Sequence, residues 1–216
     1  MAQAFSQSTV FAIKLFFLAA LILSIAAVTA ARWYSEPDVK VQAPVEQPIP
    51  FSHKHHVGDD GIDCRYCHTS VEKSAFAGMP STQICLTCHS QLFTDSPVLA
   101  PLHASMDSNT PIRWNRVHDL PDFVYFDHSI HVNKGVACIE CHGRIDEMPL
   151  TARVVSLDMQ WCLQCHRSAS RHIRPLAEVF SMTAVRPLSQ QEIGELNRFF
   201  HLQDTRRLTD CSTCHR

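Results

Sequence analysis

The sequence predicts a mainly α-helical chain with much irregular structure, in which one N-terminal transmembrane helix precedes a domain that carries five copies of a short cysteine and histidine motif. Three observations predict this fold class. They are an apolar run at residues 10–31, the recurrence of C-x-x-C-H, and an internal repeat that frames four of the five motifs.

The apolar run extends from Val10 to Ala31 and is long enough to cross a bilayer as a helix. It exceeds the usual hydrophobic region of a signal peptide, and Lys14 alone makes a poor basic leader, which favours an uncleaved anchor. The small residues at 28–30 keep a cleaved signal peptide as the alternative. We expect residues 1–32 to be a single-pass anchor in the inner membrane, with the rest on the periplasmic side.

Residues 33–50 follow as a predicted linker. Four prolines fall between residues 36 and 50, and no apolar periodicity accompanies them. This composition indicates an extended strap that holds the domain at residues 51–216 away from the bilayer.

All ten cysteines lie in C-x-x-C-H motifs, and none is left over for a disulfide. Two thiols at this spacing bind the vinyl groups of one haem, and the adjacent His ligates its iron. Zinc ribbons, the competing interpretation, need no His after each cysteine pair. The motifs therefore predict five haem c groups. The expected thioether cysteines are Cys64, Cys67, Cys85, Cys88, Cys138, Cys141, Cys162, Cys165, Cys211 and Cys214, and the expected proximal iron ligands are His68, His89, His142, His166 and His215.

The internal repeat aligns residues 51–68 with residues 126–142 after a one-residue gap. Each copy reads F-x-H-x-x-H-V, then Gly, then C-x-x-C-H, and each continues through Met-Pro to a second motif. The repeat predicts dihaem modules at 51–89 and 126–166, with a C-terminal haem unit at 167–216. Between the modules, residues 90–125 are rich in Pro, Ser and Asp and are expected to form an irregular connector. Later, Ser189 and Glu192 form a capping-box pattern that predicts a helix.

The distal iron ligands must come from the nine His that remain of the 14. The repeat selects two pairs at spacing i, i+3, which places both rings of a pair on neighbouring parts of one helical surface. His55 aligns with Ile130 and is expected to be a bystander. For the fifth ligand, the aromatic and apolar surroundings of His118 favour it over His103, His172 and His201. The expected distal set is His53, His56, His128, His131 and His118.

A methionine ligand stays open for one iron, at Met79, Met148 or Met159, because Met/His ligation also occurs in cytochromes c. Packing against a porphyrin is the expected role of these thioethers. The surplus of His predicts irons closed on both sides, which suits electron transfer and leaves no catalytic residue. A formal net charge of −2 gives no basic surface for nucleic acid.

The F-x-H-x-x-H-V frame ahead of C-x-x-C-H resembles class III cytochromes c. More narrowly, the segments at 117–132 and 159–167, with the N-terminal helix and five motifs, resemble the pentahaem cytochrome c subunit of alternative complex III. The resemblance implies an electron-transfer subunit, not itself an enzyme, in a membrane complex that oxidises quinol and reduces a cytochrome c or a terminal oxidase. The partners it implies are an iron-sulfur subunit, polytopic quinol-binding subunits and a monohaem cytochrome c.

Three other functions compete with this interpretation. A stand-alone membrane-anchored quinol dehydrogenase feeding a periplasmic reductase is similar in layout, but such proteins typically carry four haems. A multihaem reductase of nitrite, hydroxylamine or tetrathionate would need an open iron position. A freely diffusing shuttle would not keep an anchor.

Overall fold

The computed structural model describes residues 6–35, 41–183 and 186–215, and the chain divides into two units, residues 1–40 and 41–216. In the described ranges the chain is mainly helical and has no strand, only the two isolated bridges Pro44–Ala152 and Val136–Ile173. The predicted fold class is therefore confirmed.

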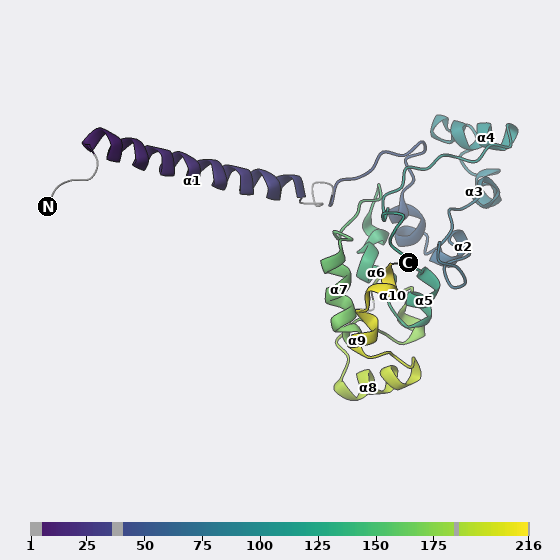
Figure 1. The fold of residues 1–216 in the computed structure, drawn as a ribbon. Coiled ribbons are helices and arrows are strands. Elements are labelled where there is room, and N and C mark those ends of the chain that lie inside the picture. The colour runs from purple at the N-terminus through teal and green to yellow at the C-terminus, as the bar shows by residue number, and fades with distance from the viewer. Residues whose placement is uncertain (1–5, 36–40, 184–185, 216) are drawn as a thin grey trace. The chain divides into compact units, whose positions relative to one another are not determined.

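The first unit carries the helix α1, Gln7–Ser35 (Figure 1). Its segment Gln7–Trp33 contains an 18-residue stretch with a mean hydropathy of 2.5 and is long and apolar enough to cross a membrane. An N-terminal signal sequence meets the same criteria. The predicted helix is confirmed, and its retention as an anchor stays a prediction.

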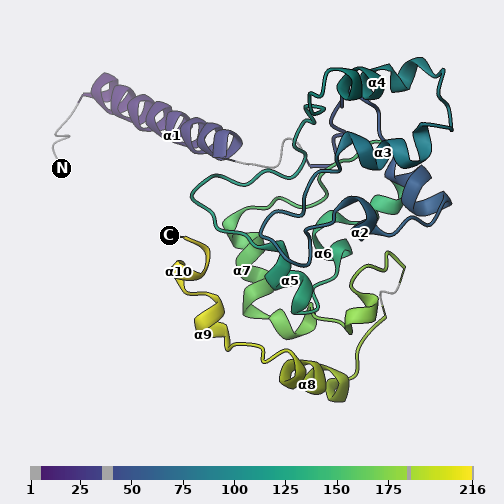
Figure 2. The same ribbon diagram turned by 90° about the vertical axis from the view of Figure 1, so that its right-hand side faces the viewer.

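The second unit is built from short helices joined by irregular segments. In both views α3 and α4 lie at one end of this unit and α8 lies at the other (Figures 1 and 2). The α-helices are α2 (Cys64–Cys67), α3 (Thr82–His89), α4 (Ala100–Asp107), α5 (His128–Asn133), α6 (Cys138–His142), α7 (Met159–Arg167), α8 (Gln190–Phe199), α9 (Thr205–Leu208) and α10 (Cys211–Cys214). A π-helical turn, η2, covers Lys54–Asp59, and 3-10 turns cover Pro97–Leu99, Ile145–Glu147, Ala169–Arg171 and Leu176–Glu178.

Aspartate caps fix where three of the motif helices begin. The Asp63 carboxylate accepts a hydrogen bond from the Arg65 N–H at 2.8 Å, and Asp210 accepts one from the Ser212 N–H at 2.9 Å. Asp158 caps α7 in the same way. A capped first turn satisfies N–H groups that such short helices leave without partners. In α2 and α10 the cap directly precedes the first cysteine, so the two thiols are held on one turn.

Buried apolar side chains are few in the described part of the domain. They are Ile49, Val71, Leu102, Val132, Ala137, Ala152, Ile173, Val179, Met182 and Phe200. One cluster joins Val71 of the first module with Val132 of the second and with Val179. A domain of this length ordinarily buries far more apolar surface than this set provides. The side chains alone therefore form only part of a core.

Two segments depart from the expectation of irregular, free structure. The predicted connector contains α4, in which Leu102 is 1% exposed and packs inward. The strap at 41–50 is bonded to the domain, because Gln42 N–H donates to the Arg153 carbonyl at 2.6 Å and Val45 N–H donates to that of Thr151 at 3.2 Å. Extended backbone satisfies its polar groups by pairing with another extended segment. Residues 36–40 of the strap lie outside the described residues.

The predicted C-terminal helix is confirmed as α8, with both hydrogen bonds of the capping box between Ser189 and Glu192. Beyond its end, Phe200 is 4% exposed, whereas Phe199 is 65% exposed. Phe200 therefore packs into the domain, whereas Phe199 faces solvent. Phe200 packs beside Gly135, whose φ of +81° and lack of a side chain permit this close approach.

Candidate haem sites

Each of the five C-x-x-C-H motifs lies on its own short helix, namely α2, α3, α6, α7 and α10. All ten cysteines are free thiols. One helical turn carries both thiols of a motif, and the helix ends within one residue of the motif His, so each helix presents two sulfurs and one imidazole from the same short segment.

Four of the motif His rings are oriented by backbone carbonyls. The Nδ1 atoms of His68, His89, His166 and His215 pair with the carbonyls of Gly78, Leu92, Leu208 and Phe123 at 2.7, 3.1, 2.8 and 3.1 Å. An Nδ1–H donated to a carbonyl fixes the tautomer in which Nε2 carries a lone pair. The arrangement therefore leaves Nε2 as the free metal-binding atom.

The remaining motif His is His142, in the third motif, and its surroundings keep it neutral. Burial, and then the neighbouring His118 and His128 rings, lower its pKa from 6.5 to about 3. A neutral imidazole is the form that binds a metal. His142 is thus ready to act as a ligand at ordinary pH.

The repeat has the same local geometry in both modules. Phe51 stacks on His56 with ring centroids 4.4 Å apart at 25°, and Phe126 stacks on His131 at 4.6 Å and 25°. Each Phe also meets the first His of its pair edge-on, at 4.9 and 4.8 Å and 88°. The Nδ1 atoms of His56 and His131 pair with the carbonyls four residues earlier, at 2.9 and 2.7 Å. These contacts hold both rings at fixed angles with Nε2 pointing away from the backbone.

The second His of each pair faces the second motif of its module. Ring centroids are 6.1 Å apart for His56 and His89, and 6.2 Å apart for His131 and His166. His128 lies 6.4 Å from His142. Two imidazoles that share a metal through nitrogen bonds of about 2 Å have ring centres about 6 Å apart. All three pairs have the separation that such a metal requires.

The remaining repeat His, His53, lies beside the first motif. Burial, and then the nearby His68 and His56 rings, lower the pKa of His53 to about 4. Its Nδ1 is paired with the Thr151 hydroxyl at 2.9 Å. His53 is therefore a neutral ring with a free Nε2. The Nδ1 of its equivalent, His128, pairs with the Ala75 carbonyl at 2.8 Å, which leaves the Nε2 of that ring free as well.

Two further imidazoles have a buried Nε2 without a hydrogen-bond partner, those of His118 and His103. A buried polar atom left unpaired is costly, so it indicates a ligand that pairs with it. His118 lies 4.3 Å from His142, too close for a metal between the two rings. The sequence favours His118 over His103 because of the aromatic and apolar surroundings of His118. His103 lies on α4, and the burial of its Nε2 depends on a helix that the composition did not predict.

The other candidates lie at the surface or are already paired. His55 is exposed and close to Asp59 and Asp60 at 3.9 and 3.6 Å, in keeping with a bystander. His172 pairs with Glu140 at 3.1 Å, and His201 is exposed. Among the methionines, Met79 and Met159 are 51% and 61% exposed, and Met148 is half-buried.

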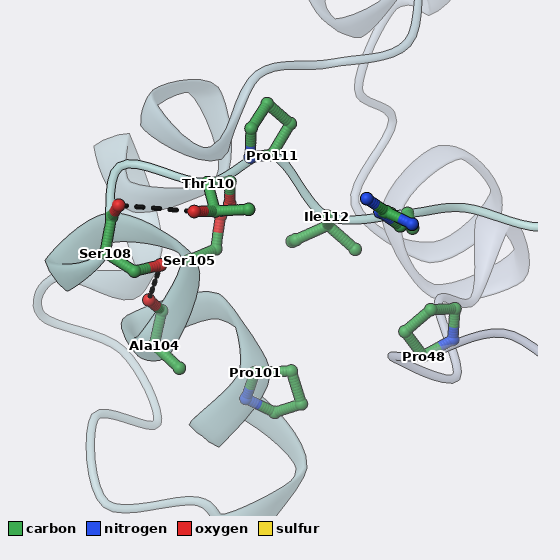
Figure 3. A pocket seen from close by; sticks show the side chains of 9 residues that line it. Pro48, Pro101, Ala104, Ser105, Ser108, Thr110, Pro111 and Ile112 are labelled. Carbon is green, nitrogen blue, oxygen red and sulfur yellow. Dashed lines mark hydrogen bonds between the residues drawn. The ribbon is translucent and has the colours of Figure 1, made fainter.

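A surface cavity of about 320 Å³ lies apart from these rings, between α4 and the strap (Figure 3). It is lined by proline, serine, threonine and aliphatic side chains and by one arginine. Ser108 hydroxyl bonds to the Ala104 carbonyl at 2.7 Å within it. No His or Cys lines it, so it does not belong to the candidate haem sites.

The donor set of this domain fits covalently attached haem. It consists of paired thiols on a helical turn, imidazoles with a free Nε2, and buried Nε2 atoms without partners. The class of protein that these features define is the multihaem cytochrome c. The chain belongs to the family of cytochrome c7 and related cytochromes c, whose pattern matches residues 49–106 and 124–216. Its cofactor is c-type haem, and its role is electron transfer.

The chain is also similar to the multihaem cytochrome c subunit of menaquinone reductase from Nitratidesulfovibrio vulgaris strain Hildenborough. The two are 39% identical over 111 residues. The match covers 51% of this chain and 51% of the relative, so it spans about half the length of each.

Proposed function

We propose that the chain carries five c-type haems and conducts electrons between them as a subunit of a membrane complex that exchanges electrons with the quinone pool. The observation that carries the proposal is the set of three imidazole pairs with ring centroids 6.1, 6.2 and 6.4 Å apart. Each pair joins a His of the repeat to a motif His. Bound haem supplies a reversible one-electron carrier at each motif.

In this proposal the ten motif cysteines hold the haems and the five motif His are the proximal ligands. His53, His56, His128 and His131 are four of the distal ligands. His118 is the fifth, since it combines aromatic and apolar sequence surroundings with a buried Nε2 that lacks a partner. An imidazole on both sides of the metal leaves no position for a substrate. The chain's residues therefore orient rings, keep them neutral and exclude water, and they perform no bond chemistry of their own.

The complex that we propose for this chain is alternative complex III or a relative of it. The resemblance of residues 117–132 and 159–167 supports it, and so does the apolar helix α1, which is long enough to anchor the domain on the periplasmic side. Electrons would then come from quinol oxidation and pass toward a monohaem cytochrome c or a terminal oxidase. The iron-sulfur and polytopic quinol-binding subunits implied by that resemblance are the proposed partners.

Reduction of menaquinone is the second candidate, because the relative from Nitratidesulfovibrio vulgaris is a subunit of a menaquinone reductase. In that case the same chain would carry electrons toward the quinone. The direction depends on the haem potentials relative to the quinone couple. Redox titration of the purified complex decides the direction of electron flow. Haems with potentials above that of the quinone couple favour quinol oxidation, and haems with potentials below it favour menaquinone reduction.

Intact-mass analysis of the mature chain tests the proposal itself. We expect five haem additions and an N-terminus that includes α1. A Cys138→Ala and Cys141→Ala double variant is the matched control and should lose a single haem. A colourless chain, or one that holds zinc, would overturn the proposal.

Purification from the native membrane then tests the assembly. We expect polytopic subunits to accompany the chain, and we expect the isolated chain to be inactive with quinol. Rapid quinol oxidation by the chain alone would instead favour the stand-alone dehydrogenase.

A further inference from the structure

We infer that the five attachment motifs form one unbranched row in the spatial order second, first, third, fourth, fifth, with the second and fifth motifs as the two ends where electrons enter and leave. The inference rests on the proposed function, because it needs haem at every motif. It names the route through the domain, which the order of the motifs in the sequence does not reveal.

The second and first motifs touch through residues inside both of them. Tyr66 lies between the two cysteines of the first motif, and Thr87 lies between those of the second. The Tyr66 hydroxyl and the Thr87 Oγ1 are 2.8 Å apart. The turn η2 reinforces the contact, since His56 faces His89 at 6.1 Å while His53 lies beside His68.

The first and third motifs lie next to each other. The ring of His128, which faces His142 of the third motif, pairs with the carbonyl of Ala75, seven residues after His68 of the first motif, at 2.8 Å. In return, the ring of His53 pairs with the hydroxyl of Thr151, nine residues after His142, at 2.9 Å. The buried cluster of Val71, Val132 and Val179 joins the two modules within the same unit. The modules are thus joined head to head through their first motifs, and each second motif lies on the far side of its own module.

The third and fourth motifs share one helix. On α5, His128 lies 6.4 Å from His142 of the third motif, and His131 lies 6.2 Å from His166 of the fourth. One helical turn separates the two ring positions.

The fourth and fifth motifs are joined through α9. His166 Nδ1 pairs with the Leu208 carbonyl at 2.8 Å, and the Thr213 hydroxyl inside the fifth motif donates to the Arg207 carbonyl at 2.9 Å.

Exposure marks the two ends independently of these contacts. Cys88 of the second motif and Cys211 of the fifth are the exposed cysteines, and the other eight are partly buried. Figure 2 shows α3, α2, α6, α7 and α10 following one another across the domain in this order. Each transfer along the row moves one electron from a reduced site to the next oxidised site. The donor is oxidised and the acceptor is reduced, and no bond forms or breaks.

Photoinjection at one end tests the order. An Arg206→Cys variant of the full-length chain, labelled on the exposed face of α9 with a ruthenium photosensitiser, injects electrons beside the fifth motif in the presence of a sacrificial donor. Absorbance then reports how many haems are reduced quickly. Loss of the second motif, by Cys85→Ala and Cys88→Ala, should leave every remaining haem quickly reducible.

Loss of the first motif, by Cys64→Ala and Cys67→Ala, should strand the second haem in the oxidised state. The reverse result for these two variants is expected if the row follows the sequence, and it would overturn the inference. A wild-type chain with fewer than five haems would instead contradict the proposed function.

Iron positions in the wild-type complex, from electron cryo-microscopy, keep the test decisive if a variant fails to fold. The first-motif iron should have the second-motif and third-motif irons as its nearest neighbours. A second-motif iron closest to any other site would overturn the order.

Discussion

The imidazole rings of His56 and His89 have centroids 6.1 Å apart, and the ring of Phe51 stacks on that of His56 with centroids 4.4 Å apart. His131, His166 and Phe126 reproduce this relationship at 6.2 and 4.6 Å. The same geometry occurs in both copies of the F-x-H-x-x-H-V frame, which indicates that the frame has a function.

Replacing His56 should open one iron to an external ligand. We expect His56→Ala to convert one site from low spin to high spin and to bind about one carbon monoxide per reduced chain, because an iron that loses an axial imidazole becomes five-coordinate. Absorption and electron paramagnetic resonance spectra measure both effects. His55→Ala is the adjacent control, and its exposed ring predicts unchanged spectra. Equal spectra for the two variants would contradict the assignment of His56.

The fifth distal ligand is decided between two rings with an unpaired buried Nε2, His118 and His103. We expect His118→Ala to produce the high-spin, carbon monoxide-binding signal. We expect His103→Ala to leave all sites low-spin and to lower only stability. The opposite pattern would transfer the role to His103, and the spectra used for His56 distinguish the outcomes.

The paired glycines of the repeat should differ in their tolerance of alanine. A Cβ at Gly135 would lie 2.5 Å from the Arg174 carbonyl oxygen and 2.7 Å from Phe200, whereas a Cβ at Gly61 would meet nothing within 4 Å. Both glycines have positive φ, so Gly61→Ala should lower the free energy of unfolding by about 1–2 kcal/mol through backbone strain alone. Gly135→Ala should lower it by about 1–3 kcal/mol more, because the added Cβ overpacks the site. Denaturant unfolding followed by circular dichroism measures the difference, and equal losses would refute it.

The cap of α8 should weaken in acid. Hydrogen bonds from Arg186, at 2.8 Å, and from Ser189 lower the pKa of Glu192 from 4.5 to about 2. A carboxyl whose folded pKa lies below its unfolded value stabilises the fold above pH 4.5, and this contribution is lost as the pH falls toward about 2. The protection factors of the α8 amides, which are exchange rates corrected for the intrinsic pH dependence of exchange, should fall over this range. Glu192→Gln should remove that pH dependence, and an identical profile in both proteins would contradict the prediction.

Local features of the chain were predictable from the sequence. The apolar run, the capping box at Ser189 and the shared geometry of the two F-x-H-x-x-H frames follow from contacts within a few residues of each other. The helical assignment of α1 and the start of α8 needed no knowledge of the rest of the fold. The repeat also identified in advance the His rings that come to lie 6.1–6.4 Å from motif His.

Features that depend on distant segments were not predictable. The contact of Tyr66 with Thr87 within the first module and that of His53 with Thr151 between the modules are set by how distant segments pack, and no local pattern encodes them. The helix α4 forms in a Pro- and Ser-rich segment because Leu102 packs inward, and this tertiary contact also buries the Nε2 atom of His103. The bonds of the strap to Thr151 and Arg153 likewise come from tertiary pairing.

The scarcity of buried side chains in the domain makes the timing of assembly important. With only a small set of apolar residues enclosed, the polypeptide alone falls short of the burial that offsets its loss of conformational entropy. We therefore expect cofactor insertion to precede compaction during biogenesis, so that each attached ring acts as a folding nucleus before it acts as a redox centre. A cell that fails to supply these rings would then lose the chain to proteolysis before any electron could cross it.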